Sequence, residues 1–453
     1  MARPKDERLT ELAERYNVAQ FVSFSVGTAP AVRNHRIYDC PPGAEFTDIA
    51  AAIDQLLKAS AGSVNVRSFR ADQDKGNPFK YGITTTESAV ATVRKLAAEG
   101  YSTIVNETID TDDGGVSGVM LGGILEFTPS DTPRGVEKPG TVSVPYQLGI
   151  GILSTIYGFQ PDLTERPNAR VEFSVHPMRV GYRREHTLHW EIECVESVAL
   201  APRIAWPNRL SRHIGDKAFG LLIAHLIDLP VPRTTVIPRA VAPFEFGRPT
   251  GTSEFWMRTC PREPQPGRFT TRFGWHDPYK VMAVEDPDGS SIASVLAQES
   301  VAAAYSGASL PAHHGRDHVE GVAGRGDDFM LGIRESEHLP AHVIRDVQDL
   351  GARAREILGP VRLEFVHDGN MAWVVQLHLT SSEYRPSIIS PGTPENGWLE
   401  FDPASGLVRL NHLISRAQHE RRGVRVVAPV GITSHVGDLL RRAGIPALLD
   451  ARD

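Results

Sequence analysis

Short apolar runs, broken by glycine, proline and charged residues, recur along the chain and predict many brief strands joined by turns. Residues 64–69 and 255–259 read as strands that carry an arginine followed by a hydroxyl residue. Residues 214–228 repeat apolar positions with a helical period, and the proline-rich residues 229–232 lead into a strand at 234–237. The pattern predicts a mixed fold of the α/β (α+β) class.

Three strand segments recur later in the chain, in the same order and about 190 residues further on, which indicates duplication of a whole unit. The matched positions are Arg67 with Arg258, Ser117 with Ser306, and Glu172 with Glu364. Chance recurrence of strand and glycine patterns is the alternative. The duplication predicts three domains, at residues 1–204, 205–385 and 386–453.

The segment Thr433-Ser434-His435 follows a β-like run at 424–429 and precedes a predicted helix that ends at Gly444-Ile445-Pro446. A helix N-terminus offers unpaired N–H groups and a partial positive charge, so a phosphorylated imidazole would be stabilised there. Histidine can carry a phosphoryl group because its neutral nitrogen is nucleophilic near neutral pH. The alternative is an N-cap by Thr433 or Ser434 beside a surface histidine.

Two further segments have the residues of a nucleotide site. Gly215 and Asp216 precede Lys217, which would project from the first turn of a helix. Residues 361–365 and 371–376 predict a hairpin around the turn at 367–370. The two strands of this hairpin carry Glu364 and Gln376, whose side chains bear oxygen donors.

Together these motifs resemble the phosphoenolpyruvate synthase and pyruvate phosphate dikinase family, over residues 205–450 and more loosely 60–200. The resemblance implies tandem ATP-grasp-like units, the first one degenerate or acceptor-binding, followed by a small phosphohistidine-like swivelling domain. His435 would be the phosphoryl carrier, with Thr433 and Ser434 beside it. The ATP-binding residues implied by the resemblance are Lys217, Arg258, Gln298, Glu320 and Gln376, and the metal-side residues are Glu364 and Gln376.

The chain departs from the family pattern at two positions. Arg362 stands where the family has a second acidic residue, and His378 stands where it has an arginine. Residues 398–410 resemble a family hairpin that normally comes after the histidine, which predicts a rearranged small domain. The large phosphoenolpyruvate/pyruvate barrel is not recognisable, so the predicted acceptor is a small molecule other than pyruvate unless a separate chain supplies a barrel.

Composition limits the partners. The net charge of -7 and the lack of a long basic stretch argue against nucleic-acid binding, and no apolar run reaches the roughly 20 residues of a membrane span. Three distant cysteines and the lack of a signal-peptide pattern predict a cytoplasmic protein. His313, His314 and His318 predict a polar loop rather than a metal site. A further hypothesis is that the acceptor binds to Arg134, Glu137 and Lys138.

The sequence therefore predicts an ATP- and magnesium-dependent phosphotransferase that passes a phosphoryl group through His435 to a small-molecule acceptor. A homo-oligomer is an open possibility. Two alternatives remain at this point. One is an ATP-grasp ligase that forms an acyl phosphate and releases ADP, and the other is a non-catalytic nucleotide-binding regulatory protein.

Overall fold

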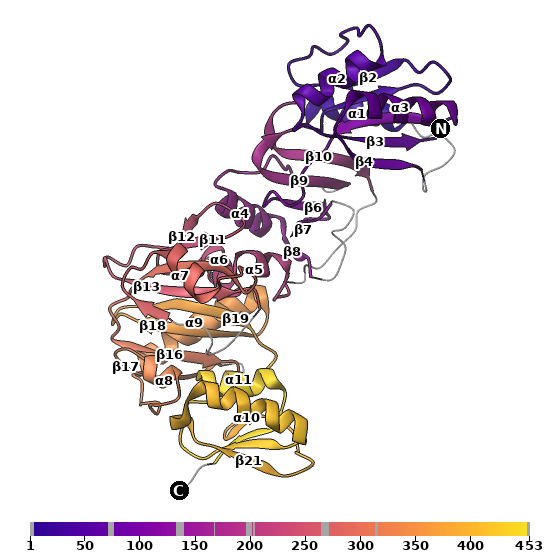
Figure 1. Ribbon diagram of the computed structural model, residues 1–453. Coiled ribbons are helices and arrows are strands. Elements are labelled where there is room, and N and C mark those ends of the chain that lie inside the picture. Colours follow the sequence, from indigo (N-terminus) through magenta and orange to yellow (C-terminus); the bar gives the residue numbers. More distant parts are fainter. Residues whose placement is uncertain are drawn as a thin grey trace. The chain divides into compact units, whose positions relative to one another are not determined.

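The computed structural model describes residues 4–70, 77–132, 140–166, 168–195, 202, 204–263, 271–312 and 316–450. The chain forms two compact units (Figure 1). The first contains Met1–Leu153 and Phe159–Arg203, and the second contains Ser154–Gly158 and Ile204–Asp453. The predicted division into three domains stays a prediction. Each unit combines helices with mainly antiparallel sheets, so the predicted mixed α and β fold is confirmed.

The first unit contains two five-stranded antiparallel sheets, in the orders β2-β1-β5-β3-β4 and β10-β9-β6-β7-β8. Its strands are β1 (Phe21–Phe24), β2 (Val32–Arg36), β3 (Val64–Phe69), β4 (Phe79–Ile83), β5 (Ser102–Glu107), β6 (Val116–Leu121), β7 (Ile124–Pro129), β8 (Val142–Pro145), β9 (Ala169–Val180) and β10 (Glu185–Cys194). Its helices are α1 (Lys5–Arg15), α2 (Ile49–Ala59), α3 (Thr86–Ala98) and α4 (Tyr146–Tyr157).

The larger part of the second unit also contains two antiparallel sheets, in the orders β12-β11-β15-β13-β14 and β17-β16-β18-β19. Its strands are β11 (Thr234–Pro238), β12 (Phe244–Phe246), β13 (Phe255–Pro261), β14 (Thr271–Phe273), β15 (Ile292–Glu299), β16 (Tyr305–Leu310), β17 (His318–Ala323), β18 (Val361–His367) and β19 (Ala372–Leu379). Its helices are α5 (Arg209–Ile214), α6 (Asp216–Leu226), α7 (Pro278–Glu285), α8 (Asp327–Met330) and α9 (Ala341–Leu358).

The end of the second unit is a small sheet in the order β20-β23-β22-β21, with β21, β22 and β23 parallel. Its elements are β20 (Ile388–Ser390), β21 (Trp398–Phe401), a 3₁₀ turn (Pro403–Ser405), α10 (Gly406–Glu420), β22 (Gly423–Val426), α11 (His435–Ala443) and β23 (Ala447–Leu449). Helices α10 and α11 pack together beside the sheet (Figure 1). Leu410 and Leu440 of these helices share one hydrophobic core with Val424 of β22.

The two units repeat one topology. The first sheet of each unit has the same strand order once β1–β5 are matched with β11–β15. The second sheets match as well, with β6, β7, β9 and β10 corresponding to β16, β17, β18 and β19, while β8 has no counterpart strand among the described residues of the second unit. The repeat inferred from short sequence matches is therefore also a structural repeat.

Strand register supports the same correspondence. In the first unit Arg67 lies opposite Ile104 and Glu172 lies opposite Val119. In the second unit Arg258 lies opposite Leu296 and Glu364 lies opposite Ala308. The matched arginines and glutamates thus occupy equivalent positions in equivalent strand pairs, which chance similarity of short segments would not produce.

Several predicted elements are confirmed, namely the strands at 64–69, 234–237 and 255–259, the helix that begins beside Lys217, and the helix that begins at His435. The predicted strand at 406–410 is wrong because this segment is the start of α10. Leu410, Ile414 and Ala417 are buried on one face of that helix, so the apolar spacing is helical. Of the hairpin that residues 398–410 resemble, the first strand is present as β21, and α10 stands in place of the second.

Among the described residues, none of the helices combines the length and the apolarity that crossing a bilayer requires.

Candidate functional site

Lys217 lies in the first turn of α6, and a glycine places it there. Gly215 has a φ of +97°, and a Cβ at this position would lie 2.4 Å from the Cβ of Cys260. Only glycine fits so close to β13 with this backbone conformation. Burial lowers the pKa of the Lys217 ammonium, and the charges of Arg258 and Glu364 act on it as well. The lysine is therefore close to two other predicted site residues.

Arg258 and Gln298 are in direct contact across β13 and β15. The guanidinium Nη1 of Arg258 donates to the side-chain oxygen of Gln298 at 2.6 Å and to the carbonyl of Val375 at 3.3 Å. Gln298 is buried, and its amide donates to the hydroxyl of Thr234 at 3.3 Å. Two residues for which the sequence resemblance implies ATP binding are thus in direct contact.

Glu364 and Gln376 lie opposite each other on β18 and β19. Arg362 donates to Glu364 at 3.0 Å within the same strand. Although burial alone would raise it, the pKa of Glu364 is lowered to about 2 by Arg362, His435 and Arg258. Glu364 is therefore a carboxylate at neutral pH, with positive groups around it.

His378, the second departure from the family pattern, connects this pair of strands to α6. Its Nε2 lies 2.6 Å from the Nε2 of Gln376, and its Nδ1 lies 3.2 Å from Oδ2 of Asp216. Asp216 and His378 thus fix the start of α6 against β19. Sequence reasoning identified His378 as a departure from the family pattern and Asp216 as the residue before Lys217, and it did not predict the contact between them.

His435 is the first residue of α11 and lies close to the same cluster. Burial is the main cause that lowers the pKa of its imidazole. The positive charges of Arg362 and Lys217 lower this pKa as well, and the negative charges of Glu364 and Asp438 oppose the shift. The imidazole is therefore neutral and nucleophilic at neutral pH. Ser434 is the N-cap residue but makes no side-chain cap hydrogen bond, and its Oγ is buried without a partner.

Glu320 and Thr433 are also in contact, beside the cluster. Both the N–H and the hydroxyl of Thr433 donate to Oε2 of Glu320 at 2.8 Å. The carbonyl of Thr433 accepts a hydrogen bond of 2.8 Å from Arg362. Glu320 therefore contacts the segment that carries His435. Arg362 contacts both that segment and Glu364.

Sequence reasoning did not assign Arg362 and Asp438 a place in the site. Asp438 lies in the first turn of α11, and its pKa is lowered to about 2, against the effect of burial, by Arg362, Arg442 and Arg441. The one sequence signal for Arg362 was its departure from the family pattern, because the family has an acidic residue at this strand position. No sequence signal pointed to Asp438, because its place beside the site depends on Arg362, which is far away in the sequence.

The donor set for Mg²⁺ is small. Within the described ranges, no group of three or more His, Cys, Asp or Glu side chains is arranged to hold a metal ion. Glu364 and Gln376 provide two facing oxygen-bearing side chains, and magnesium sites at nucleotides commonly use one or two carboxylates plus phosphate oxygens and water. Glu364 and Gln376 fit that type of site, in which most ligands come from the nucleotide and from water.

Buried polar atoms without partners mark the same place. Asp216 Oδ1, Arg362 Nε and Ser434 Oγ are all buried and make no hydrogen bond. Buried polar groups in folded proteins are nearly always paired, so unpaired ones need an explanation. A polar ligand among α6, β18 and the start of α11 would supply the missing partners.

The first unit repeats only part of this arrangement. Arg170 and Glu172 form an ion pair at 2.5 Å in β9, as Arg362 and Glu364 do in β18. Arg67 lies over the ring of Trp190 at 5.7 Å from its centre, whereas Arg258 contacts a glutamine. The first unit therefore has charged residues at the same strand positions, but its arginine in β3 contacts a tryptophan where the arginine in β13 contacts a glutamine.

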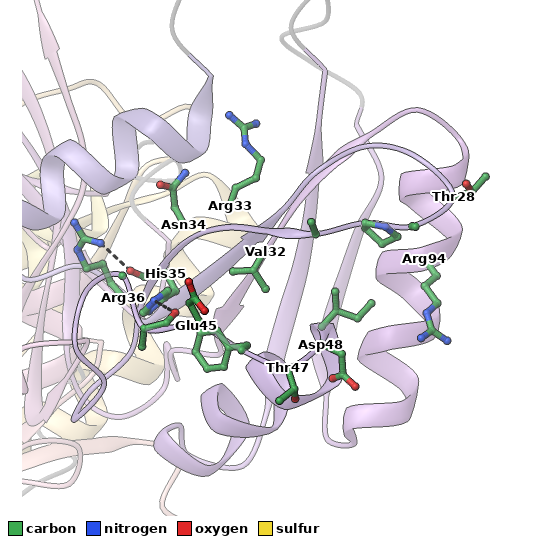
Figure 2. A pocket seen from close by; sticks show the side chains of 17 residues that line it. Thr28, Val32, Arg33, Asn34, His35, Arg36, Glu45, Thr47, Asp48 and Arg94 are labelled. Carbon is green, nitrogen blue, oxygen red and sulfur yellow. Dashed lines mark hydrogen bonds between the residues drawn. The ribbon is translucent and has the colours of Figure 1, made fainter.

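A pocket of about 790 Å³ lies in the first unit along β2 and the loop that leads into α2 (Figure 2). Figure 2 shows Arg33, Arg36 and Arg94 at separate places around it. Arg33 lies 3.4 Å from Asp6 and 3.1 Å from Glu7. Arg33 is thus already paired with two carboxylates of α1. The guessed acceptor residues Arg134, Glu137 and Lys138, like His313 and His314, lie outside the described residues.

No protein-family model matches the chain, and no curated protein sequence matches it. Solved structures similar to it include a RimK domain protein ATP-grasp from Sphaerobacter thermophilus, at 17% identity and a TM-score of 0.23. Two others are D-alanine–D-alanine ligases, from Bacillus anthracis in complex with ATP (12% identity, TM-score 0.24) and from Coxiella burnetii (10% identity, TM-score 0.23). None of these three is named as a synthase or dikinase of phosphoenolpyruvate.

These matches cover 37%, 38% and 37% of this chain and 58%, 57% and 47% of the respective solved chains. The chain thus spans about half the length of the proteins it matches.

Proposed function

We propose that the second unit binds ATP with magnesium and transfers a phosphoryl group, first to His435. One observation carries this proposal: Arg362 of β18 donates to Glu364 at 3.0 Å and to the carbonyl of Thr433, two residues before His435 of α11, at 2.8 Å. The charge of Glu364 also acts on Lys217 of α6. These residues come from α6, β18 and α11, which are far apart in sequence. Their convergence is what a transfer from nucleotide to histidine requires.

In this proposal Lys217 and Arg258 neutralise the phosphates of ATP. A guanidinium suits two-point contact with phosphate, and the ammonium supplies a compact charge. Glu364 and Gln376 would hold Mg²⁺, which supplies charge neutralisation at the transferring phosphoryl group when it is bound. Asp216 and His378 keep α6 against β19, so that Lys217 stays near Glu364.

The imidazole of His435 is neutral at neutral pH and can attack phosphorus. In the dikinase-type step that the sequence resemblance implies, a nitrogen of His435 bonds to the β-phosphorus and AMP leaves. Water then removes the terminal phosphoryl group as inorganic phosphate. The first N–H groups of α11 and the unpartnered hydroxyl of Ser434 would stabilise the phosphoryl group on the histidine.

The acceptor in this proposal is a small molecule, and an acceptor domain on a separate chain is a second possibility. Neither nucleic acid nor a membrane is a partner in this account.

The ligase hypothesis remains the main competitor. It proposes an acyl phosphate formed from ATP, release of ADP, and a purely structural role for His435. The names of two similar structures are those of ligases, which agrees with this hypothesis. The non-catalytic hypothesis is favoured by the ion pair between Arg362 and Glu364, because the arginine occupies part of the carboxylate that a metal would need.

Product analysis separates the three hypotheses. Purified protein is incubated with Mg²⁺ and ATP, and the nucleotides are resolved by chromatography, for the wild type and for His435→Ala. AMP formed in an amount equal to the protein, and absent for His435→Ala, is the result we expect. ADP from both proteins, dependent on an added carboxylic acid, would support the ligase. ATP recovered intact in every case would support a binding protein.

A further inference from the structure

Thr433 is fully buried, and side chains of the neighbouring sheet bind every one of its polar groups. Its N–H and hydroxyl both donate to Oε2 of Glu320 in β17, and its carbonyl accepts from Arg362 in β18. All three distances are 2.8 Å. We call residues 431–435 the histidine loop, because it ends at His435. Its centre is therefore fixed by partners outside the small sheet.

Glycine permits this close approach. A Cβ at Gly431 would lie 2.4 Å from the ring of Phe329 in α8 and 3.1 Å from Oε2 of Glu320. The loop therefore passes α8 at a distance that no larger residue allows. At its other end, a Cβ at Gly437 would lie 2.1 Å from the carbonyl oxygen of Ile432, so the loop and the first turn of α11 are packed as one piece.

Glu320 itself is held in place from the other side. Nε2 of His318 lies 3.1 Å from Oε1 of Glu320, and the His318 ring stacks on Tyr384 with a centroid distance of 3.5 Å. Both carboxylate oxygens of Glu320 thus have protein partners. A contact with ATP, which the sequence resemblance implies for this residue, would have to compete with Thr433.

We infer that Glu320, together with Arg362, is a positioning residue that docks Thr433 so that His435 lies at the Lys217–Glu364 cluster, rather than a nucleotide ligand. This inference rests on the proposed function for its effect on phosphoryl transfer. Two bonds from Thr433 reach one oxygen of Glu320, so a change of the carboxylate weakens both bonds and loss of the hydroxyl removes one of them. Either change should loosen the histidine loop. Nucleotide binding at Lys217 and Arg258 does not depend on it.

The test compares Glu320→Gln, Thr433→Val and their double variant with the wild type. Thr433→Ser, which keeps the hydroxyl, is the rescue variant. Glu126→Gln is the matched control, because Glu126 lies opposite Val119 in β7 just as Glu320 lies opposite Ala308 in β17. Three quantities are measured: the Kd of a non-hydrolysable ATP analogue, the rate of label transfer from β-labelled ATP to His435, and amide hydrogen exchange in the peptide that contains Thr433.

We expect labelling to slow at least tenfold in Glu320→Gln and Thr433→Val, with no further loss in the double variant. The Kd should change less than twofold, and exchange at the histidine loop should become faster. Thr433→Ser and Glu126→Gln should behave as the wild type. A tenfold weaker Kd in Glu320→Gln alone would assign Glu320 to the nucleotide and overturn the inference.

The exchange measurement keeps the two proposals separate. If the wild type takes no label, phosphoryl transfer to His435 is refuted, and exchange alone then decides the docking contact. Faster exchange at the histidine loop in Glu320→Gln, but not in Glu126→Gln, would still support docking. Unchanged exchange in Glu320→Gln would refute it.

Discussion

At the scale of single residues, the second unit brings side chains of opposite charge together in its interior. Arg362 and Glu364 are both buried and paired, and Lys217 and Arg258 lie close to the same carboxylate. Burying charge is costly unless it is paired, so such clusters are seldom kept for stability alone. The excess of positive groups beside one carboxylate is what an anionic ligand such as a triphosphate would balance.

Lys217→Met should separate function from stability. We expect the affinity for ATP to fall tenfold to hundredfold, because a charge-assisted contact contributes about 1.5–3 kcal/mol. Thermal stability should stay the same or rise, since methionine removes a partly desolvated charge. Titration calorimetry and a melting curve measure both quantities. Lys280→Met, at an exposed lysine of α7, is the control, and equal loss of affinity in both variants would contradict the assignment.

The buried His189 should make the stability of the first unit depend on pH. Burial lowers the pKa of its imidazole to about 4, against an ordinary value of 6.5. The folded pKa lies below the unfolded one, so the unfolded state takes up the proton first as pH falls. The free energy of unfolding is therefore unaffected above pH 6.5 and drops by up to about 2 kcal/mol on going from pH 7 to pH 5.

The free energy of unfolding of the first unit is measured by denaturant titration at pH 7 and at pH 5. His189→Gln should lose less stability over this range than the wild type does. His412→Gln, at an exposed histidine of α10, should retain the full dependence on pH. Identical pH dependence in the wild type and His189→Gln would show that His189 is not the group responsible.

At the scale of elements, apolar periodicity predicted well where a segment was long or bounded by turn residues. Helix α6 and the strand β11 were found because Gly215 and the prolines at 230 and 232 mark their ends. Helix α10 was missed because residues 398–410 were assigned to a hairpin from their resemblance to the family, and not from their apolar spacing. Helix α5, at 209–214, is only six residues long, and its start depends on a cap by Asn208.

The paired glycines of β6 and β16 give an element-level prediction. A Cβ at Gly118 would lie 2.4 Å from the carbonyl oxygen of Glu126, and one at Gly307 would lie 2.0 Å from that of Glu320. Each alanine variant must therefore push a neighbouring strand away, at a cost of about 1–3 kcal/mol. We expect Gly307→Ala also to displace β17 and slow the labelling of His435, while Gly118→Ala leaves labelling intact.

Unfolding curves and labelling rates for the two variants provide the check, and each variant serves as the control for the other. Equal effects on labelling would mean that β17 does not help to place the histidine loop.

At the scale of the whole molecule, the chain uses one topology twice and adds one small sheet. The sequence could reveal the repeat because Arg67, Glu172 and their counterparts keep their strand positions. It could not reveal the contacts of Glu320 with Thr433 or of Arg362 with Thr433, which join residues that are far apart in the chain. Such contacts follow from tertiary packing, and no local pattern encodes them.

The two compact units predict two separate unfolding transitions. Because the proposed ATP site lies entirely in the second unit, ATP with Mg²⁺ should raise only that unit's transition. At a ligand concentration of about 100 times Kd, the expected stabilisation is about 2.7 kcal/mol. Differential scanning calorimetry with and without nucleotide measures this shift. A shift in the other transition would place nucleotide in the first unit.

The central claim is that His435 receives a phosphoryl group from ATP. The most direct measurement is to incubate the purified protein with Mg²⁺ and ATP labelled in the β-phosphate, and then to map acid-labile, alkali-stable label by peptide mass spectrometry. The account predicts label on His435, approaching one per chain, and none in His435→Ala. The absence of label from a protein that binds ATP, or label that persists in His435→Ala, would contradict it.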